Sequence, residues 1–259
     1  MPKRDRLLMR ILLTRNPIHN MLMRREIEKL DITDSLHVFE APLLEQVPIE
    51  ESLESLVSFL HNRVVDDVIF ISPSAVQFGF IKLLRLLELR RVFAVGRGTA
   101  NMLHIELGKA SKDIPVIYPQ KHVGAQALLN LFELQQVKGR EILIVTGIEG
   151  KPLLEKVLLE RSARVSRWEC YQRQKPSGLP KQMQQVRSLG CDYVFLHSAH
   201  AVKHFLEELP ENMQTKSIKA IVGSEAIAQE LRLTQWDGEI LIAASPMPKD
   251  MLRYLKSSM

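Results

Sequence analysis

The stretch VIFISPSAV at residues 68–76 decides the fold, because it returns almost type for type as VFLHSAHAV at residues 194–202. In each copy, an apolar run typical of a buried strand leads through a serine into a pattern with helical spacing. A second pair of stretches follows in the same order, FAVG at residues 93–96 and AIVG at residues 220–223. The sequence therefore predicts two versions of one strand–turn–helix unit.

Outside these stretches, short β-rich runs alternate with amphipathic segments along the whole chain. This alternation is typical of α/β folds, in which helical crossovers join parallel strands. We therefore expect two lobes, each with a mainly parallel sheet flanked by helices. The expected strands centre on Ile11, Val38, Ile69, Val95, Val116, Ile144, Trp168, Phe195, Ile221 and Ile242. Expected helices cover residues 75–87, 99–107, 125–134, 153–159 and 226–231.

The repeat also predicts where the lobes divide. The second copy begins near residue 192 and holds too few strand–helix units for a full sheet, while residues 7–31 have no nearby partner. Joining these two pieces gives one discontinuous lobe and one inserted lobe, with two linker strands between them and a ligand cleft at the carboxyl ends of the strands. The expected boundaries are 1–36 with 174–259 for the first lobe, 43–167 for the second, and 37–42 and 168–173 for the linkers.

Composition favours an acidic partner. Hydrophobic residues make up 46% of the 259 residues and charged residues 25%, as in ordinary globular proteins. The net charge of +5 favours anions, among them polycarboxylates. Nucleic-acid binding is a weaker alternative, because 35 basic residues are interspersed with 30 acidic ones and aromatic residues reach only 6%.

Cysteine usage and hydropathy bear on the compartment. Cys170 and Cys191 lie in apolar runs that predict strands and form no C-x-x-C motif, so we expect two reduced core thiols. Residues 1–10 lead straight into a strand-like run, without the apolar segment and cleavage site of a signal peptide. No segment is uninterrupted enough to span a bilayer, so we expect a cytoplasmic protein that does not bind a membrane.

The turns after the expected strands are the most informative positions, because backbone N–H groups at helix N-termini bind anions. Ser72 followed by Pro73 is also a good helix cap, and capping is the simpler role for any single serine. The recurrence of small or hydroxylated residues at corresponding turns favours ligand binding. These turns read SPS at 72–74, GRGT at 96–99, GIEGK at 147–151, SAH at 198–200 and GSE at 223–225.

Two nucleotide-binding motifs are excluded by spacing. After Gly96 and Gly98, the chain has Asn101 where the dinucleotide fingerprint needs its third glycine. The turn at residues 147–151 has the wrong spacing for a P-loop, with Pro152 where serine or threonine is required. We therefore expect no nucleotide cofactor.

A helical histidine pair is the one candidate for a metal site. His200 and His204 have the i, i+4 spacing of zinc ligands. However, the glutamate of the H-E-x-x-H motif is missing and no third ligand is evident. Solvated or partly packed histidines fit this pattern better, and we expect no metal.

A family resemblance rests on an ordered set of stretches rather than on one motif. They are ILLTR at 11–15, the repeat at 68–76, AVGRGTA at 94–100, the turn at 147–151, ECYQR at 169–173 and the repeat at 194–202. In this order, and over nearly the whole chain, they resemble uroporphyrinogen-III synthases of the bacterial stand-alone form.

The resemblance implies an activity as well as a fold. Members of that family have two α/β lobes joined by a two-stranded linker and act on hydroxymethylbilane, an octa-carboxylate, without cofactor or metal. As cyclising hydro-lyases of tetrapyrrole and haem biosynthesis, they remove the terminal hydroxyl as water, invert ring D through a spiro intermediate and close the ring. Because the bilane alone closes to the type I isomer, positioning of the substrate should dominate the mechanism.

The resemblance also implies roles for individual residues. Tyr171 matches a tyrosine proposed to assist departure of the hydroxyl; alternatively, it packs where the lobes join. A phenol is a modest proton donor at neutral pH, so we expect its loss to slow rather than abolish turnover. Thr99 matches a threonine of the family's cleft. The expected substrate-binding set is Thr14, Arg15, Ser72, Ser74, Arg97, Gly98, Thr99, Gly147, Gly150, Lys151, Ser198 and Ser224.

One turn departs from the family pattern. Where many members carry threonine, this chain reads GSEA at residues 223–226, so the hydroxyl is lost or moved to Ser224. Glu225 would repel a substrate carboxylate unless it stays in solvent or serves its own helix N-terminus.

A non-catalytic alternative stays open at this point. A two-lobed module that closes on a polyanionic ligand would have the same fold, because fold does not fix function. Nothing in the sequence demands a protein partner, so we expect a monomer.

Overall fold

The computed structural model describes residues 8–30, 35–60, 64–148, 150–210 and 215–256. The chain forms two compact units, which are treated separately below. Unit 1 comprises Met1–Glu45 and Gln174–Met259, and unit 2 comprises Gln46–Arg173. The boundary therefore falls at β3 (Glu45–Pro48), where the chain enters unit 2, and at the end of β8 (Arg164–Gln174), where it leaves.

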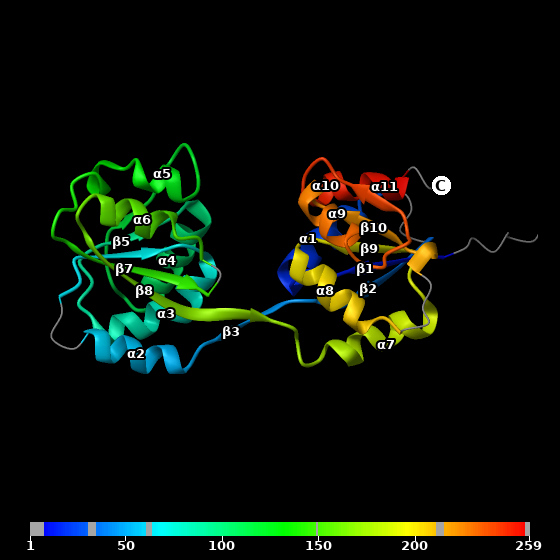
Figure 1. Ribbon diagram of the computed structural model, residues 1–259, viewed down its shortest axis with the longest axis horizontal. Coiled ribbons are helices and arrows are strands. Elements are labelled where there is room, and N and C mark those ends of the chain that lie inside the picture. The colour runs from blue at the N-terminus through cyan, green and yellow to red at the C-terminus, as the bar shows by residue number, and fades with distance from the viewer. Residues whose placement is uncertain (1–7, 31–34, 61–63, 149, 211–214, 257–259) are drawn as a thin grey trace, which may run out of the picture. The chain divides into compact units, whose positions relative to one another are not determined.

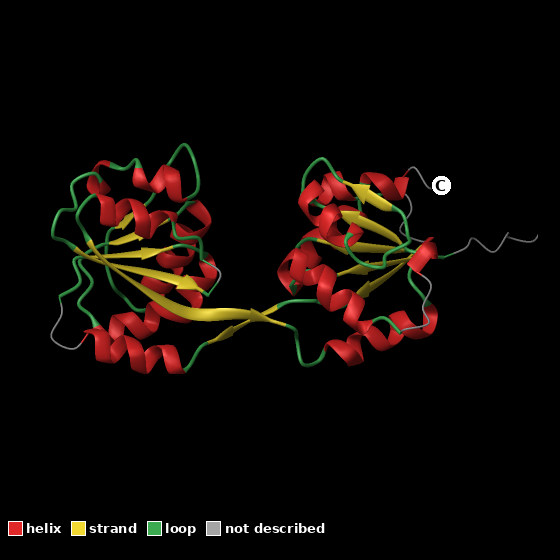
Figure 2. Ribbon diagram, in the orientation of Figure 1, coloured by secondary structure: helices red, strands yellow, loops and turns green. Residues whose placement is uncertain are grey.

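Unit 1 contains a five-stranded parallel sheet in the order β11-β10-β9-β1-β2 (Figures 1 and 2). Its strands are β1 (Met9–Leu13), β2 (Leu36–Glu40), β9 (Tyr193–Leu196), β10 (Lys219–Val222) and β11 (Ile240–Ile242). Its helical segments are α1 (Pro17–Ile27), α7 (Leu179–Leu189), α8 (Ala199–Glu208), η3 (Thr215–Ser217), α9 (Glu225–Arg232), α10 (Pro248–Met251) and α11 (Arg253–Lys256).

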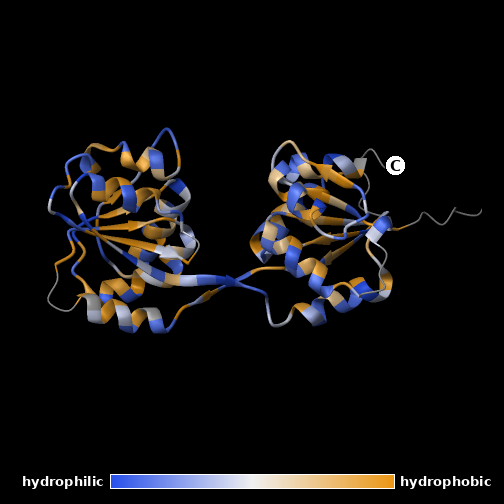
Figure 3. Cartoon of the chain, in the orientation of Figure 1, coloured by the Kyte–Doolittle hydropathy of each residue, from blue (hydrophilic) through white to orange (hydrophobic). Residues whose placement is uncertain are grey.

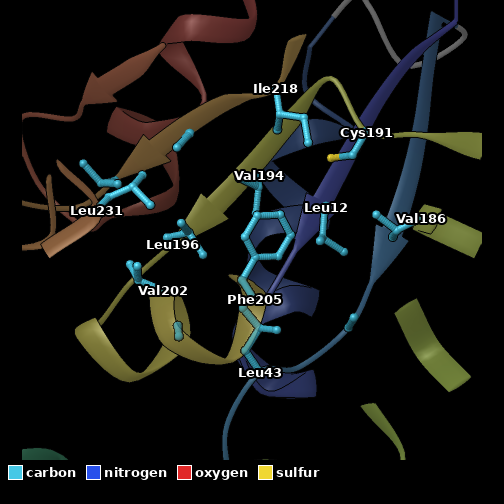
Figure 4. Packing of buried hydrophobic residues seen from close by; sticks show 14 of the residues in the cluster. Leu12, Leu43, Val186, Cys191, Val194, Leu196, Val202, Phe205, Ile218 and Leu231 are labelled. Atoms are coloured by element: carbon cyan, nitrogen blue, oxygen red, sulfur yellow. The ribbon is translucent and has the colours of Figure 1, made fainter. Parts of the chain in front are cut away.

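Alternation along the strands of unit 1 builds a core on each face of the sheet. Leu12 and Val194 pack with Phe205 of α8 and Leu231 of α9 on one face (Figure 4). Ile11, Leu13 and Phe195 face the other way, onto α1, α10 and α11. A parallel sheet covered by helices on both faces explains why its strands are continuous apolar runs.

Unit 2 contains a six-stranded sheet in the order β3-β8-β7-β4-β5-β6. Its further strands are β4 (Asp67–Phe70), β5 (Val92–Ala94), β6 (Val116–Ile117) and β7 (Glu141–Gly147). Its helical segments are α2 (Glu51–Leu60), α3 (Pro73–Leu86), α4 (Arg97–Lys109), α5 (Ala125–Leu129), η2 (Phe132–Leu134) and α6 (Leu153–Glu160). Figure 3 shows the inner strands of the sheet as largely hydrophobic, whereas β8 and the helices carry both kinds of residue, which agrees with amphipathic helices over a buried sheet.

The two sheets repeat one strand order. Unit 2 runs β6-β5-β4-β7-β8, and unit 1 runs β11-β10-β9-β1-β2, so β1 and β2 occupy the places of β7 and β8. The N-terminal segment thus completes the sheet that the second copy of the repeat begins. The prediction of two α/β lobes with mainly parallel sheets flanked by helices is confirmed.

The expected linker strands differ from the observed elements. Residues 37–42 do not form a free linker: His37 to Glu40 pair with β1 along the edge of the unit 1 sheet, because Val38 and Phe39 supply apolar surface there. Residues 168–173 continue β8, whose first half pairs with β7.

The strand β3 was not predicted. Its neighbour Ile49 donates from N to the Cys170 oxygen at 3.2 Å, while Gln174 Nε2 donates to Glu45 Oε1 at 2.8 Å, so β3 runs antiparallel to β8.

Both cysteines are free and buried. Cys170 lies in β8 and Cys191 lies just before β9. Burial raises the pKa of both thiols to about 12. They are therefore protonated packing residues rather than thiolates.

Candidate functional site

A pocket of about 220 Å³ opens at the carboxyl edge of the unit 2 sheet. Three neighbouring strand ends form it: those of β4, β7 and β8. In parallel α/β sheets, ligands bind at this edge. The lining residues are Ile71, Ser72, Thr146, Gly147, Ile148, Gly150, Lys151, Tyr171, Gln172 and Arg173.

A β-bulge positions Tyr171 in this pocket. Thr146 lies opposite Glu169, but the next residue, Gly147, lies opposite Tyr171, so Cys170 is the extra residue of β8. A bulge of this kind bends a strand and changes the direction of the side chains beyond it. Tyr171 is only 6% exposed, and its ring stacks on Phe78 with 5.7 Å between centroids. Its orientation is therefore fixed by packing.

Gly147 provides the surface on which the Tyr171 ring lies. A Cβ atom at Gly147 would stand 2.7 Å from Tyr171 Cζ and 2.8 Å from Cε2. No side chain can occupy that space without displacing the ring. Glycine at this turn is thus a requirement for close approach of the phenol to the backbone.

The next glycine closes the turn. Gly150 N donates to the Gly147 oxygen at 3.0 Å, and Arg167 donates to the Gly150 oxygen at 3.1 Å. A Cβ atom at Gly150 would overlap Thr146 Oγ1. Between these glycines, Glu149 lies outside the described residues. The two glycines allow β7 to end in a tight turn that leaves the pocket open.

Ser72 connects the phenol to a helix N-terminus. Its Oγ accepts a hydrogen bond from Ala75 N at 3.0 Å and so caps α3, with Pro73 in the first turn. The same Oγ lies 3.1 Å from the Tyr171 hydroxyl. A serine oxygen can accept from one group while its proton goes to another. Ser72 can therefore cap the helix and hold the Tyr171 hydroxyl at once.

The repeat reproduces the cap in unit 1. Ser198 has an extended backbone like that of Ser72, and its side chain accepts from Ala201 N at 3.1 Å. The third turn is different: Ser224 precedes α9 but makes no capping hydrogen bond. Glu225 pairs with Arg232 at 2.5 Å in an exposed position, which keeps it engaged with its own helix.

The predicted site residues fall into three groups. Tyr171, Ser72, Gly147, Gly150 and Lys151 meet in the unit 2 pocket. Ser74, Arg97, Gly98 and Thr99 belong to unit 2 but do not line it. Thr14, Arg15, Ser198 and Ser224 belong to unit 1. Their roles toward a substrate remain predictions.

Several hydroxyls of the expected set are engaged inside the protein. Thr14 donates to the Phe195 oxygen and so joins β1 to β9. Ser74 donates to Gln46 at 2.6 Å. Thr99 is only 3% exposed in the first turn of α4, whereas Arg97 and Gly98 beside it are exposed. At α4, therefore, the exposed backbone and Arg97 are better placed than Thr99 to meet a ligand.

Some pocket residues were not singled out from the sequence. Ile71, Thr146, Ile148 and Gln172 line the pocket beside the expected residues. Each lies within two positions of a residue that was expected, so position at a strand end was the available signal. Arg173, the last residue of the ECYQR stretch, also lines the pocket.

The two edges of the unit 2 sheet differ in charge pairing. At the amino edge, Asp67 pairs with Arg91 and Arg140 at 2.7 Å each, and Arg164 pairs with Glu141 at 3.0 Å. At the carboxyl edge, Arg97 and Lys151 form no salt bridge with any residue that the structure describes. Cations without acidic partners around exposed backbone N–H groups favour an anionic ligand.

Two further features limit the kinds of site. Among the described residues, no three histidine, cysteine or acidic side chains are placed to hold a metal ion. Within the same ranges, no helix combines the length and apolarity needed to cross a membrane.

Comparison with known proteins identifies a family. The family model for uroporphyrinogen-III synthase HemD matches residues 26–253. The uroporphyrinogen-III synthase of Salmonella typhimurium is 38% identical over 137 residues, which cover 51% of this chain and 53% of that protein. That of Proteus mirabilis is 30% identical over 171 residues, covering 64% of this chain and 80% of the relative. The alignment with the Salmonella protein thus spans about half of that relative's length.

The fold has solved counterparts. The crystal structure of uroporphyrinogen-III synthetase from Helicobacter pylori aligns with a TM-score of 0.55 at 16% identity, covering 85% of this chain and 92% of that one. At this identity the likeness shows the shared two-domain fold.

Proposed function

This chain belongs to the uroporphyrinogen-III synthase family, and from that premise we propose that it converts hydroxymethylbilane into uroporphyrinogen III, with inversion of ring D and loss of water. The single observation that carries the proposal is the pocket in which a buried, hydrogen-bonded phenol meets open backbone turns at the carboxyl edge of the unit 2 sheet. We propose that the reaction takes place in the cytoplasm, in a monomer, without added cofactor or metal.

The size of the pocket indicates which part of the substrate it takes. Its volume of about 220 Å³ lies below the range of about 300–1,000 Å³ for sites that enclose a whole small molecule. A linear tetrapyrrole with eight carboxylates is too large for a pocket of this volume. We therefore assign to this pocket the reacting end of the bilane, where the terminal hydroxyl leaves, with the rest of the substrate bound outside it.

The hydrogen bonds around Ser72 suit proton donation by Tyr171. Ala75 N–H donates to Ser72 Oγ, so the serine proton is free to donate to the Tyr171 oxygen. The phenolic proton then points to the leaving hydroxyl, and the two depart together as water. The oxygen left on Tyr171 keeps the Ser72 hydrogen bond and lies near the positive end of α3, which favours negative charge.

Positioning contributes the rest of the mechanism. Without the protein, the bilane closes without inversion of ring D. The protein must therefore hold the reacting end of the bilane so that ring D is inverted as the macrocycle closes. Phe78 and Gly147 hold the Tyr171 ring in place beside one pyrrole. Arg97 and Lys151 are exposed, form no salt bridge with a described residue, and can meet its carboxylates. Fixed geometry of this kind accelerates reactions by lowering the entropic cost of reaching the transition state.

The proposal is tested by product analysis. The purified full chain is mixed with freshly prepared hydroxymethylbilane without cofactor, and the type I and type III products are separated after oxidation. Predominantly type III product, formed faster than the spontaneous reaction, supports the proposal. Type I product at the spontaneous rate overturns it and favours a binding module for a polyanionic ligand.

A further inference from the structure

Two basic side chains stand side by side at the carboxyl edge of the unit 1 sheet. β1 and β9 are parallel neighbours, with Leu13 opposite Phe195. Arg15 and His197 each follow these residues by two positions and lie just past the ends of β1 and β9, so both stand at the same edge of the sheet. The face of the sheet that carries Leu13 and Phe195 is covered by α1.

α1 adds a third basic group to the pair. His19 lies in its first turn, where His19 N donates to Asn16 Oδ1 at 3.0 Å and Nδ1 lies 2.7 Å from the same oxygen. Burial lowers the pKa of His19, and the charge of Arg15 lowers it further. Arg15, His19 and His197 therefore lie close enough for their charges to interact. We refer to these three residues as the basic cluster.

The basic cluster has no acidic partner among the residues that the structure describes. Arg15 forms no salt bridge with a described residue, and burial lowers its pKa. At the other end of β1, by contrast, Arg10 pairs with Asp192 at 2.8 Å, and this hydrogen bond raises the Arg10 pKa. A cation that is partly buried without a counter-ion is costly.

The acids on neighbouring elements are engaged elsewhere. Glu40 on β2 accepts from Arg24 and, at 3.4 Å, from Asn20. Glu225 on α9 pairs with Arg232. On α8, Glu207 pairs with Lys175 and Lys203, and Glu208 pairs with Lys175 and Arg187. Asp250 of α10 pairs with Arg253 of α11, and His200 is exposed.

His197 carries the strongest sign of an unmet interaction. Its Nδ1 is buried and has no hydrogen-bond partner among the described residues. Burial, and then the charges of Arg15 and His19, lower the pKa of His197 to about 3. The ring is therefore neutral at physiological pH, although an anion beside it would favour its protonated form.

We propose that Arg15 and His197 form an anion subsite in unit 1 that takes one carboxylate, and that His197 gains a proton from solvent when the carboxylate binds. The subsite follows from the structure of unit 1, while its assignment to a carboxylate of the bilane rests on the proposed function. The bound anion supplies the negative charge that Arg15 lacks, and the protonated ring then donates a hydrogen bond to it. When the anion leaves, the proton returns to solvent.

Because a proton is taken up when the anion binds, the affinity of this subsite must depend on pH. The bound state holds one proton more than the free state, so anion affinity must fall as pH rises. The fall approaches tenfold per pH unit wherever the bound histidine is protonated and the free one is not. A subsite built from Arg15 without His197 would show only the smaller pH dependence that the nearby His19 contributes.

The test uses the full chain and trifluoroacetate, a carboxylate that stays ionised throughout. Its binding is followed by the histidine C2–H resonances and by the ¹⁹F signal between pH 5.5 and 7.5, with His197→Asn assigning the His197 peak. We expect saturable binding that weakens as pH rises, by up to about tenfold per pH unit, and moves the His197 peak toward its protonated position. Arg15→Gln should weaken binding at least tenfold, while Arg90→Gln, at an exposed arginine of unit 2, should not.

The outcomes separate the subsite from the proposed activity. Equal affinity in Arg15→Gln and the unaltered chain, or an affinity that does not change with pH, overturns the subsite. If Arg15→Gln unfolds, His197→Asn keeps the test, because binding to it should persist with a smaller pH dependence. Binding as expected in a protein that makes no type III product would refute the proposed function and leave the subsite in place.

Discussion

Ser72 and Ser198 occupy the same turn in two copies of one unit, yet their surroundings differ. Their φ and ψ angles are −158° and 160° for Ser72 and −161° and 160° for Ser198, and their capping bonds are 3.0 and 3.1 Å long. Beside Ser72, the neighbouring strands carry Tyr171, whose ring packs against Gly147. Beside Ser198 they present the basic cluster. Capping thus fixes the turn, while the side chains at adjacent strand ends determine what the turn can do.

We propose that the reaction takes place beside the Ser72 turn of unit 2, and that the Ser198 turn of unit 1 lies beside a subsite for a carboxylate. The following substitutions are designed to break this difference in role or to sharpen it, in order of decreasing expected effect.

Gly147→Ala should have the largest effect. The new methyl group would meet Tyr171 Cζ at 2.7 Å, so the ring must move. We expect a loss of about 1–3 kcal/mol in the free energy of unfolding from overpacking, and a fall in turnover of about 100-fold from displacement of the phenol. Denaturant unfolding and the rate of type III formation measure the two effects.

Gly108→Ala is the matched control for this substitution. A Cβ atom at Gly108, inside α4, meets nothing within 4 Å. We expect a gain in stability of about 0.5–1 kcal/mol and unchanged turnover. Similar losses of turnover in both variants would show that the pocket does not depend on the contact between Gly147 and Tyr171.

Ser72→Ala and Ser198→Ala should differ in their effects on catalysis. Each removes one capping bond, at a cost of about 1 kcal/mol, and Ser72→Ala also removes the hydrogen bond to the buried Tyr171 hydroxyl. Loss of the Ser72 hydroxyl also frees the Tyr171 hydroxyl, and we expect kcat to fall by about tenfold, the value of one hydrogen bond. Ser198→Ala should act mainly on KM, because its turn faces the anion subsite. Steady-state kinetics of the two variants measure this difference, and a matching fall in kcat would contradict it.

The smallest expected effect on kcat accompanies His197→Asn, which should instead change the pH dependence of stability. In an unfolded chain histidine titrates near 6.5, whereas the pKa of His197 in the folded chain is about 3. Between these values the unfolded chain binds more protons than the folded chain. The free energy of unfolding should therefore decrease as the pH is lowered, by up to about 1.4 kcal/mol per unit. Urea unfolding at pH 7 and pH 5 should show a smaller fall for His197→Asn than for the unaltered chain.

The control for that measurement is His104→Asn, at an exposed histidine of α4. Its fall in stability between the two pH values should match that of the unaltered chain. If His197→Asn also matched it, the ring would be protonated at the same pH in the folded and unfolded chains, and the basic cluster would lose its electrostatic basis.

Much of the fold could be predicted because buried strands appear in the sequence as apolar runs. The strands β4 and β9 are four-residue segments buried on both faces and apolar except for Asp67, and the repeat identified them as equivalent. β3 escaped prediction because the sequence EQVP is half polar, ends in proline and becomes a strand only by pairing with β8. Pairing between distant segments leaves little trace in a short edge strand.

The site was predictable in its parts but not in its contacts. Tyr171 and Ser72 stood out separately from the resemblance and from the turn pattern. Their contact joins residues 99 positions apart and depends on the bulge at Cys170, which no local pattern encodes. The burial of Thr14 and Thr99 was equally hidden, because a hydroxyl that bonds inside the protein and one that meets a ligand look alike in sequence.

The most direct test of the account is the rate and isomer composition of product formed by Tyr171→Phe in a single turnover of hydroxymethylbilane. The substitution keeps the ring on Gly147 and Phe78 and removes only the hydroxyl. We expect type III product still in excess over type I, formed about 100-fold more slowly than by the unaltered chain, since one proton donor is lost and positioning is kept. An undiminished rate of type III formation would contradict the central claim that the phenol of the unit 2 pocket takes part in the reaction.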